Sequence, residues 1–172
     1  MEDLKAAIAQ YNLTDVIELS DDERLNKVRQ YCILLWLKNE QMNLTRHTTW
    51  EQFVSRDLVD TLQLAPLLPK DAQVLDVGSG GGVPGMLLAI LRPDLKMTLT
   101  ESVGKKAAAL GEFAGALELD VEIYNERAEN ILDDFRFDFT VARAVGPMIK
   151  MCRWFEEHWP SVGRLLAIKG PK

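Results

Sequence analysis

The sequence is poor in the residue types that build metal sites and disulfide frameworks. It contains two histidines and two cysteines among 172 residues. His47 and His158 are too few and too far apart for a metal site or a catalytic relay. Cys32 and Cys152 each lie in an apolar segment, which favours two buried free thiols and a reducing compartment. We therefore expect a chain that folds without metal or disulfides, since one of this length can bury a core large enough to be stable.

The sequence also lacks a basic surplus and a long apolar run. Lys and Arg number 20 against 26 Asp and Glu, a net charge of −6. Nucleic-acid binders usually carry a basic surplus, so RNA binding would require a local basic face. No apolar run approaches the roughly 18 residues of a membrane span, and residues 1–12 are acidic and amphipathic, unlike a signal peptide. We expect a cytoplasmic monomer that does not contact membranes.

Two patterns of hydrophobic residues divide the chain. Ser20 and Glu23 form a capping box that predicts a helix ending near Met42, and a second amphipathic helix is expected at 50–64. From residue 73, five short apolar runs alternate with helical segments, which predicts an α/β fold with a mostly parallel sheet and helices on both faces. The strands are expected at 73–77, 96–101, 121–124, 137–142 and 164–168, and the helices at 84–91, 104–118, 128–133 and 147–158. Residues 1–70 would form an N-terminal helical cap on an α/β domain of residues 71–172, together one compact unit.

The strongest motif follows the first predicted strand. Five glycines fall within residues 78–85, where backbone amides can approach a ligand without a Cβ in the way. Gly78, Gly80 and Gly82 follow Asp76, whereas the dinucleotide fingerprint would require glycine at Val83. This acidic-x-Gly-x-Gly-x-Gly pattern resembles the first motif of S-adenosylmethionine-dependent methyltransferases. A carboxylate at Asp76 suits the ammonium of such a cofactor, through water.

Glu101 ends the second predicted strand, 25 residues after Asp76. An acidic residue there can accept hydrogen bonds from both hydroxyls of a ribose, as it does in dinucleotide-binding enzymes. Arg127, Ala128 and Glu129 follow the third strand, where we expect contacts to adenine. The glycine loop and Glu101 together predict a nucleoside-containing ligand.

The motifs of two kinds of methylation are missing from the sequence, and Arg143 indicates a different target atom. The fourth strand lacks the Asn/Asp-Pro-Pro-aromatic motif of amine methylation, and Cys152 lies in a helical segment, where it is poorly placed as a nucleophile. An arginine fork matches the paired N7 and O6 acceptors of guanine, and methylation of N7 needs no general base. The alternative is that Arg143 pairs with an acid such as Asp76 or Asp138 and only holds the loop.

The sequence resembles the bacterial 16S ribosomal RNA guanine-N7 methyltransferases, the glucose-inhibited division protein B family. The matching stretches, which span about 130 residues, are Asn43-Leu44-Thr45, Arg56…Asp60, the glycine loop with Pro84-Gly85, Gly104-Lys105-Lys106, Arg127-Ala128-Glu129, Arg143-Ala144 and Lys169-Gly170. The family often has His at the position of Asp57. It also continues with more strand-forming sequence after the fifth strand, so we expect C-terminal strands of the family fold to be missing here and a sheet edge to be unpaired.

The resemblance implies a class I methyltransferase that modifies a guanine in small-subunit ribosomal RNA, as naked RNA or in an assembly particle. S-adenosyl-L-methionine is the expected cofactor, with no metal. Its expected contacts are Asp76, Gly78, Ser79, Gly80, Gly82, Pro84, Glu101, Ser102, Arg127, Ala128, Glu129 and Arg143. Arg143 and Lys169 are the expected catalytic residues, and the RNA contacts are Arg46, Lys105, Lys106 and Arg127. Two alternatives stay open: a cofactor-binding module with weak or no catalysis, and an NAD-dependent oxidoreductase.

Overall fold

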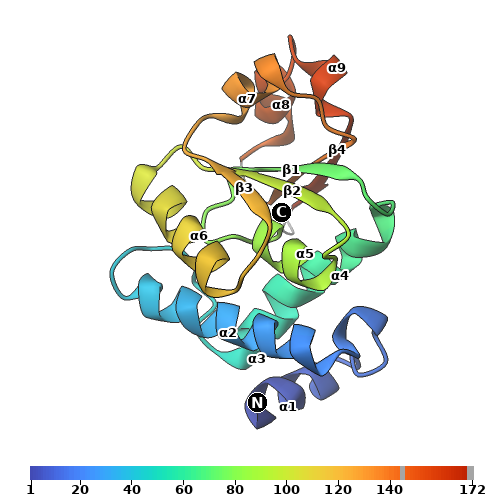
Figure 1. Ribbon diagram of the computed structural model, residues 1–172, viewed down its shortest axis with the longest axis vertical. Helices are drawn as coiled ribbons and strands as arrows, with labels where there is room; N and C mark the ends of the chain where they lie inside the picture. The colour runs from blue at the N-terminus through green and yellow to red at the C-terminus, as the bar shows by residue number, and fades with distance from the viewer. Residues whose placement is uncertain (144–145, 170–172) are drawn as a thin grey trace.

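The computed structural model describes residues 1–143 and 146–169 and contains a five-stranded parallel sheet (Figure 1). The strand order is β3-β2-β1-β4-β5, with β1 at the centre. The strands are β1 (Gln73–Val77), β2 (Lys96–Thr100), β3 (Val121–Tyr124), β4 (Phe139–Arg143) and β5 (Arg164–Ile168). All five predicted strands and their parallel pairing are confirmed, with β4 shifted by up to two residues. Within the described residues, β5 pairs on one side only.

Helices cover both faces of the sheet, as the alternation predicted. The helical elements are α1 (Glu2–Gln10), η1 (Ile17–Leu19), α2 (Asp22–Asn39), α3 (Trp50–Gln52), η2 (Phe53–Leu58), α4 (Val59–Leu64), η3 (Ala65–Leu67), α5 (Gly85–Leu91), α6 (Gly104–Ala116), α7 (Ala128–Asp134), α8 (Met148–Trp154) and α9 (Trp159–Val162). The larger hydrophobic core joins α1, α2, α5 and α6 to one face of the sheet, and a second core joins α7, α8 and α9 to the other (Figure 1). The predicted boundary at residue 70 stays a prediction, although side chains from both sides of it share the larger core.

Three of the predicted helices require correction. The cap of α2 is Asp21, whose carboxylate accepts from the amides of Glu23 and Arg24, and not Ser20 as predicted. The same helix ends at Asn39, whose side chain accepts hydrogen bonds from the amides of the following loop.

The predicted helix at 50–64 is confirmed in extent, but its middle, η2, is a wider π-helical turn. The predicted helix at 147–158 is two helices, α8 and α9. Pro160 has no amide hydrogen and is tolerated only in a first turn, so a new helix starts at Trp159.

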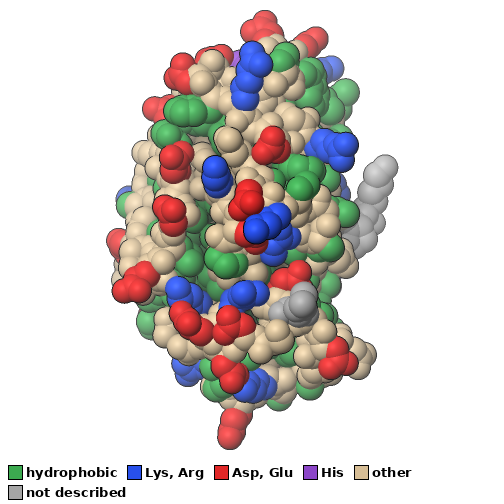
Figure 2. Space-filling view, turned by 45° about the vertical axis from the view of Figure 1, so that its right-hand side comes forward, with side chains coloured by type: hydrophobic (Ala, Val, Ile, Leu, Met, Phe, Trp, Pro, Cys, Tyr) green, Lys and Arg blue, Asp and Glu red, His purple; other side chains and the backbone are tan. Residues whose placement is uncertain are grey.

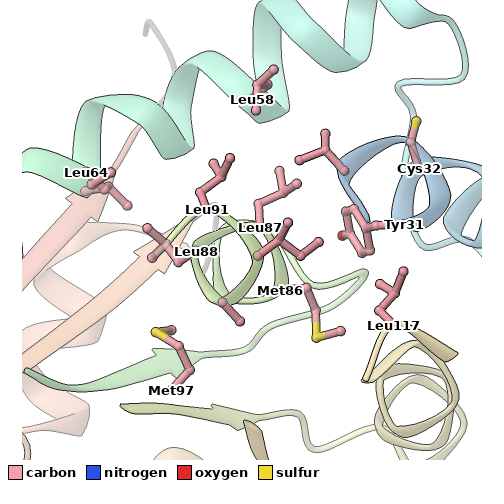
Figure 3. Packing of buried hydrophobic residues seen from close by; sticks show 14 of the residues in the cluster. Tyr31, Cys32, Leu58, Leu64, Met86, Leu87, Leu88, Leu91, Met97 and Leu117 are labelled. Atoms are coloured by element: carbon pink, nitrogen blue, oxygen red, sulfur yellow. The ribbon is translucent and has the colours of Figure 1, made fainter. Parts of the chain in front are cut away.

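Helix α5 lies at the centre of the larger core (Figure 3). Leu87, Leu88 and Leu91 on this helix are fully buried; Leu87 and Leu91 point toward Leu58 from η2, and Leu88 points toward Leu64 from α4. Burial of side chains this size contributes roughly 1.5–3 kcal/mol each. The glycine loop that precedes α5 is therefore held between the sheet and the cap.

Charged side chains of both signs alternate over the face in Figure 2, with apolar atoms between them. Neither sign of charge dominates this face. Of the two free cysteines, Cys32 is buried as predicted, whereas Cys152 is only half-buried. Among the described residues, no helix is both long and apolar enough to cross a membrane.

Candidate functional site

The glycine loop connects β1 to α5 in a conformation that other residues rarely adopt. Gly78, Gly80 and Gly82 have φ values of 65°, 58° and 102°, in the left-handed region. A Cβ on Gly82 would lie 2.5 Å from the Cγ of Met86, and one on Gly85 would lie 2.4 Å from a carboxylate oxygen of Asp76. Glycine is thus required both for the turn and for the close approach of α5 to β1.

Two side chains distant in sequence hold this loop from opposite sides. The hydroxyl of Tyr31 in α2, which is fully buried, donates to the carbonyl oxygen of Gly81 at 2.7 Å. The amide of Gly80 donates to Oε2 of Glu101 at 2.9 Å. The loop is therefore fixed between the cap and the end of β2.

Asp76 carries a buried carboxyl with one oxygen left unpaired. It is 1% exposed, and its Oδ2 accepts from the amide of Gly85 at 3.1 Å. Its Oδ1 is buried and has no hydrogen-bond partner among the described residues. Burial raises the pKa of Asp76 from 3.8 to about 6, against the opposing effect of its hydrogen bonds. An unpaired acceptor of this kind fits a cationic ligand group, directly or through water.

Glu101 lies directly after β2, at the carboxyl edge of the sheet. Its Oε1 accepts from the amide of Val103 at 2.8 Å, and the side chain is 7% exposed. Each carboxylate oxygen accepts one bond from the backbone, and each has further lone-pair capacity for a ligand hydroxyl. The side chain thus already joins the glycine loop to the start of α6.

A cleft opens beside the glycine loop, and we call it the Gly78 cleft. It is lined by Val77, Gly78, Thr100, Ser102, Glu126, Arg127, Ala128, Glu129 and Trp154. These residues follow β1, β2 and β3 and include one on α8, so the predicted positions 78, 102 and 127–129 come together. The strand order reverses between β1 and β4. Ligands of open α/β sheets bind at the carboxyl ends of the strands near such a switch point. Trp154 is a cleft residue that the sequence did not single out.

Arg143 ends β4 and forms ion pairs with two acids from the cap. Its Nη2 lies 2.6 Å from Oδ1 of Asp57 and its Nη1 lies 3.4 Å from Oδ2 of Asp60. The alternative that Arg143 pairs with a nearby acid is confirmed, but the acids are Asp57 and Asp60. The two examples named from the sequence have other partners: the carboxylate of Asp138 accepts from the amide of Gln73 and that of Asp76 from the amide of Gly85. Burial raises the pKa of Asp60, and the Arg143 charge opposes that rise.

The same carboxylate of Asp57 also contacts a histidine. Asp57 is fully buried, and its Oδ1 lies 2.8 Å from Nδ1 of His47. His47 and Arg143 line an open hollow of about 660 Å³ together with Asn43, Leu44, Thr45 and Arg46, which we call the Arg143 hollow. The sequence predicts that Arg46 contacts the substrate RNA. In the structure Arg46 lines this hollow together with Arg143.

The predicted residues Lys105, Lys106 and Lys169 are not among those that line the Arg143 hollow. Lys105 and Lys106 begin α6, with Lys105 exposed and Lys106 half-buried. The ammonium of Lys169 donates to the carbonyl of Gly146 and lies 3.3 Å from the Sδ of Met151. Ala144 and Gly170, which belong to the quoted motifs, lie outside the described residues.

Sequence reasoning missed His47, Asp57 and Asp60 as parts of one cluster. The scarcity of histidine argues against a relay built from histidines, but it does not bear on a cluster that combines one histidine with acids and an arginine. The available signal was the Arg56…Asp60 stretch and the presence of Asp57 where the family often has His. Neither observation identifies Arg143 as the partner, 86 residues further along the chain.

The sequence matches a known protein family over most of its length. The family model for rRNA small subunit methyltransferase G (GidB) matches residues 24–172. A relative of that name from Rhodopirellula baltica is 53% identical over 99% of this chain, which spans 71% of the relative. Another from Thermobifida fusca is 42% identical over 72% of this chain, which spans 51% of it.

Solved structures with low sequence identity share the fold. MtNAS in complex with MTA and tNA has a TM-score of 0.57 at 17% identity, covering 96% of this chain and 65% of that one. A Thiobacillus denitrificans SAM-dependent methyltransferase in complex with S-adenosyl-L-homocysteine has a TM-score of 0.50 at 22% identity, covering 65% and 47%. The predicted class I methyltransferase fold is therefore confirmed. The chain belongs to the rRNA small subunit methyltransferase G (GidB) family.

Proposed function

We propose that this chain transfers a methyl group from S-adenosylmethionine to N7 of a guanine in small-subunit ribosomal RNA. The observation that carries the proposal is the arrangement at the carboxyl edge of the sheet. The buried, unpaired Oδ1 of Asp76, the Gly78 cleft and Arg143 all lie at the ends of β1, β2 and β4. Family membership supplies the ribosomal RNA substrate.

The residues present fit the cofactor. Asp76 would attract its ammonium group, and Glu101 would accept hydrogen bonds from the ribose hydroxyls. Ser102 and the stretch 127–129 would enclose its adenine, while Ser79, Pro84 and the loop glycines shape the space beside it. S-adenosylmethionine supplies an activated methyl group on a sulfonium when it is bound.

The chain would contribute alignment to the reaction, because methyl transfer is an in-line displacement that depends on positioning. Arg143 would donate to O6 of the guanine and leave the N7 lone pair facing the methyl carbon. The N7 lone pair would accept the methyl group without loss of a proton, so the chain needs to supply no base. Asp57 and Asp60 offset the Arg143 charge, which would otherwise oppose the positive charge that develops on the guanine.

We further propose Lys169 as a second catalytic residue at the same edge, and Arg46, Lys105, Lys106 and Arg127 as phosphate contacts. Electrostatic contacts to phosphates act within about 8–10 Å at ordinary salt. A local group of cations can therefore bind RNA despite a net charge of −6. The protein would act in the cytoplasm as a monomer without a metal ion, on ribosomal RNA or on a small-subunit assembly particle.

Two measurements test the function. Calorimetry should show binding of S-adenosyl-L-homocysteine and none of NAD. Labelled methyl transfer to small-subunit RNA lacking the modification should yield 7-methylguanosine after digestion to nucleosides. Binding without transfer to RNA or subunits would instead identify a cofactor-binding module, and NAD binding would identify an oxidoreductase.

A further inference from the structure

His47 and Asp57 form an oriented pair inside the Arg143 hollow. The Oδ1 of Asp57 lies 2.8 Å from Nδ1 of His47 and 2.6 Å from Nη2 of Arg143. Asp57 is fully buried, and its contact with Arg143 makes it the anionic partner of an ion pair. An ionised carboxylate only accepts hydrogen bonds, so Nδ1 of His47 must be the donor.

This contact decides what the other ring nitrogen can do. In a neutral imidazole with hydrogen on Nδ1, Nε2 carries a free lone pair and is an acceptor. By holding the hydrogen on Nδ1, Asp57 therefore leaves Nε2 of the neutral His47 ring as an acceptor, whereas Arg143 offers only donors.

The backbone around His47 is fixed as well. Its amide donates to the hydroxyl of Thr45 at 3.0 Å, and its carbonyl accepts from the indole of Trp36 at 2.7 Å. The side chain of Asn39 accepts from the amides of Leu44 and Thr45. The imidazole is thus held in place by the loop as well as by Asp57.

We propose that His47 is a base-reading residue of this site, whose Nε2 accepts a hydrogen bond from the N1–H of the target guanine. The inference rests on the proposed function and deepens it. In guanine, O6 lies between N7 and N1–H, so Arg143 on O6 and His47 on N1–H leave N7 free for the methyl group. Adenine carries an acceptor at N1 and an amine in place of O6, so both contacts would fail.

The same contact strengthens as the reaction proceeds. Methylation at N7 places a positive charge on the guanine ring, which makes N1–H a better donor. A contact that is stronger in the transition state than in the ground state accelerates the reaction. His47 would therefore affect kcat as well as KM, with Asp57 acting as its positioning residue.

The first test is the tautomer of His47, measured in the full chain by proton–nitrogen correlation with labelled histidine. The sequence has only two histidines, so a His158→Gln variant assigns the spectrum. His158 lies 3.4 Å from Asp133, away from the hollow, which makes this variant a matched control. Hydrogen on Nδ1 alone supports the proposal, whereas hydrogen on Nε2, with or without hydrogen on Nδ1, overturns it whether or not the protein methylates RNA.

The second test compares His47→Leu with His47→Gln in methyl transfer to small-subunit RNA. The leucine variant should lose at least about tenfold in kcat/KM, with affinity for S-adenosyl-L-homocysteine unchanged. The glutamine variant, whose amide oxygen can accept, should stay within about threefold of wild type, as should His158→Gln. Full kcat/KM in the leucine variant, checked by its melting temperature, would overturn the proposal. An inactive wild-type protein would refute the proposed function instead.

Discussion

Replacing Asp76 by Asn should stabilise the ligand-free protein above about pH 6. Burial raises the pKa of this carboxyl from 3.8 to about 6, so the folded protein holds a proton there that the unfolded chain releases. Stability must then fall as the pH rises from about 4 to about 6, and it stays lower above that range. A tenfold change in proton affinity is worth about 1.4 kcal/mol, so the ionised carboxylate costs about 3 kcal/mol.

Asparagine keeps the shape of the side chain and the acceptor for the Gly85 amide, but it carries no charge. At about pH 8 the variant should be more stable by up to about 3 kcal/mol, which corresponds to roughly 6–12 °C in melting temperature. At about pH 4 the gain should vanish, because wild-type Asp76 is protonated there. Thermal melts across this pH range measure both values.

The affinity for cofactor should fall in Asp76→Asn, although the stability of the variant rises. Without the carboxylate, the ammonium of the ligand loses a charged partner, which should weaken S-adenosyl-L-homocysteine binding by about 1.5–3 kcal/mol. Asp138→Asn is a matched control, because Asp138 is exposed and its carboxylate accepts only the Gln73 amide among the contacts described. A stability gain in Asp76→Asn that is equal at all pH values would refute the charge argument, and unchanged ligand affinity would refute the ammonium role.

Three further predictions follow from single contacts. Glu101→Ala should weaken S-adenosyl-L-homocysteine binding by about 1.5–3 kcal/mol in calorimetry, since the ribose hydroxyls lose their acceptor. Arg143→Lys should lower methyl transfer at least about tenfold with ligand affinity nearly unchanged, because lysine lacks the planar fork. Tyr31→Phe should destabilise the protein by about 1–3 kcal/mol in denaturant unfolding, since the buried carbonyl of Gly81 loses its donor.

Each of these has an outcome that contradicts it. Unchanged affinity in folded Glu101→Ala would count against the ribose site. If Arg143→Lys loses ligand binding and melts lower, its role is to hold the cap and the loop. A Tyr31→Phe protein as stable as wild type would mean that water satisfies the Gly81 carbonyl.

The sequence by itself determined the strands, the glycine loop and the edge where the site forms. Apolar runs and turn residues act locally, and the carboxyl ends of parallel strands meet at one edge whatever the details of packing. Asp76 lies one residue before the end of β1, Glu101 follows β2 and Arg143 ends β4, so their grouping could be predicted. Local patterns also placed helix ends, with errors where neighbouring residues compete, as Asp21 does with Ser20 for the cap of α2.

Only the tertiary structure decided what surrounds Arg143. Its partners Asp57 and Asp60 lie in η2 and α4, and His47 lies in the loop before them. Their approach depends on how the cap docks against the sheet, through the buried side chains around α5 (Figure 3). A contact across 86 residues is set by that packing and by the charges it buries together, which no local pattern in the sequence encodes.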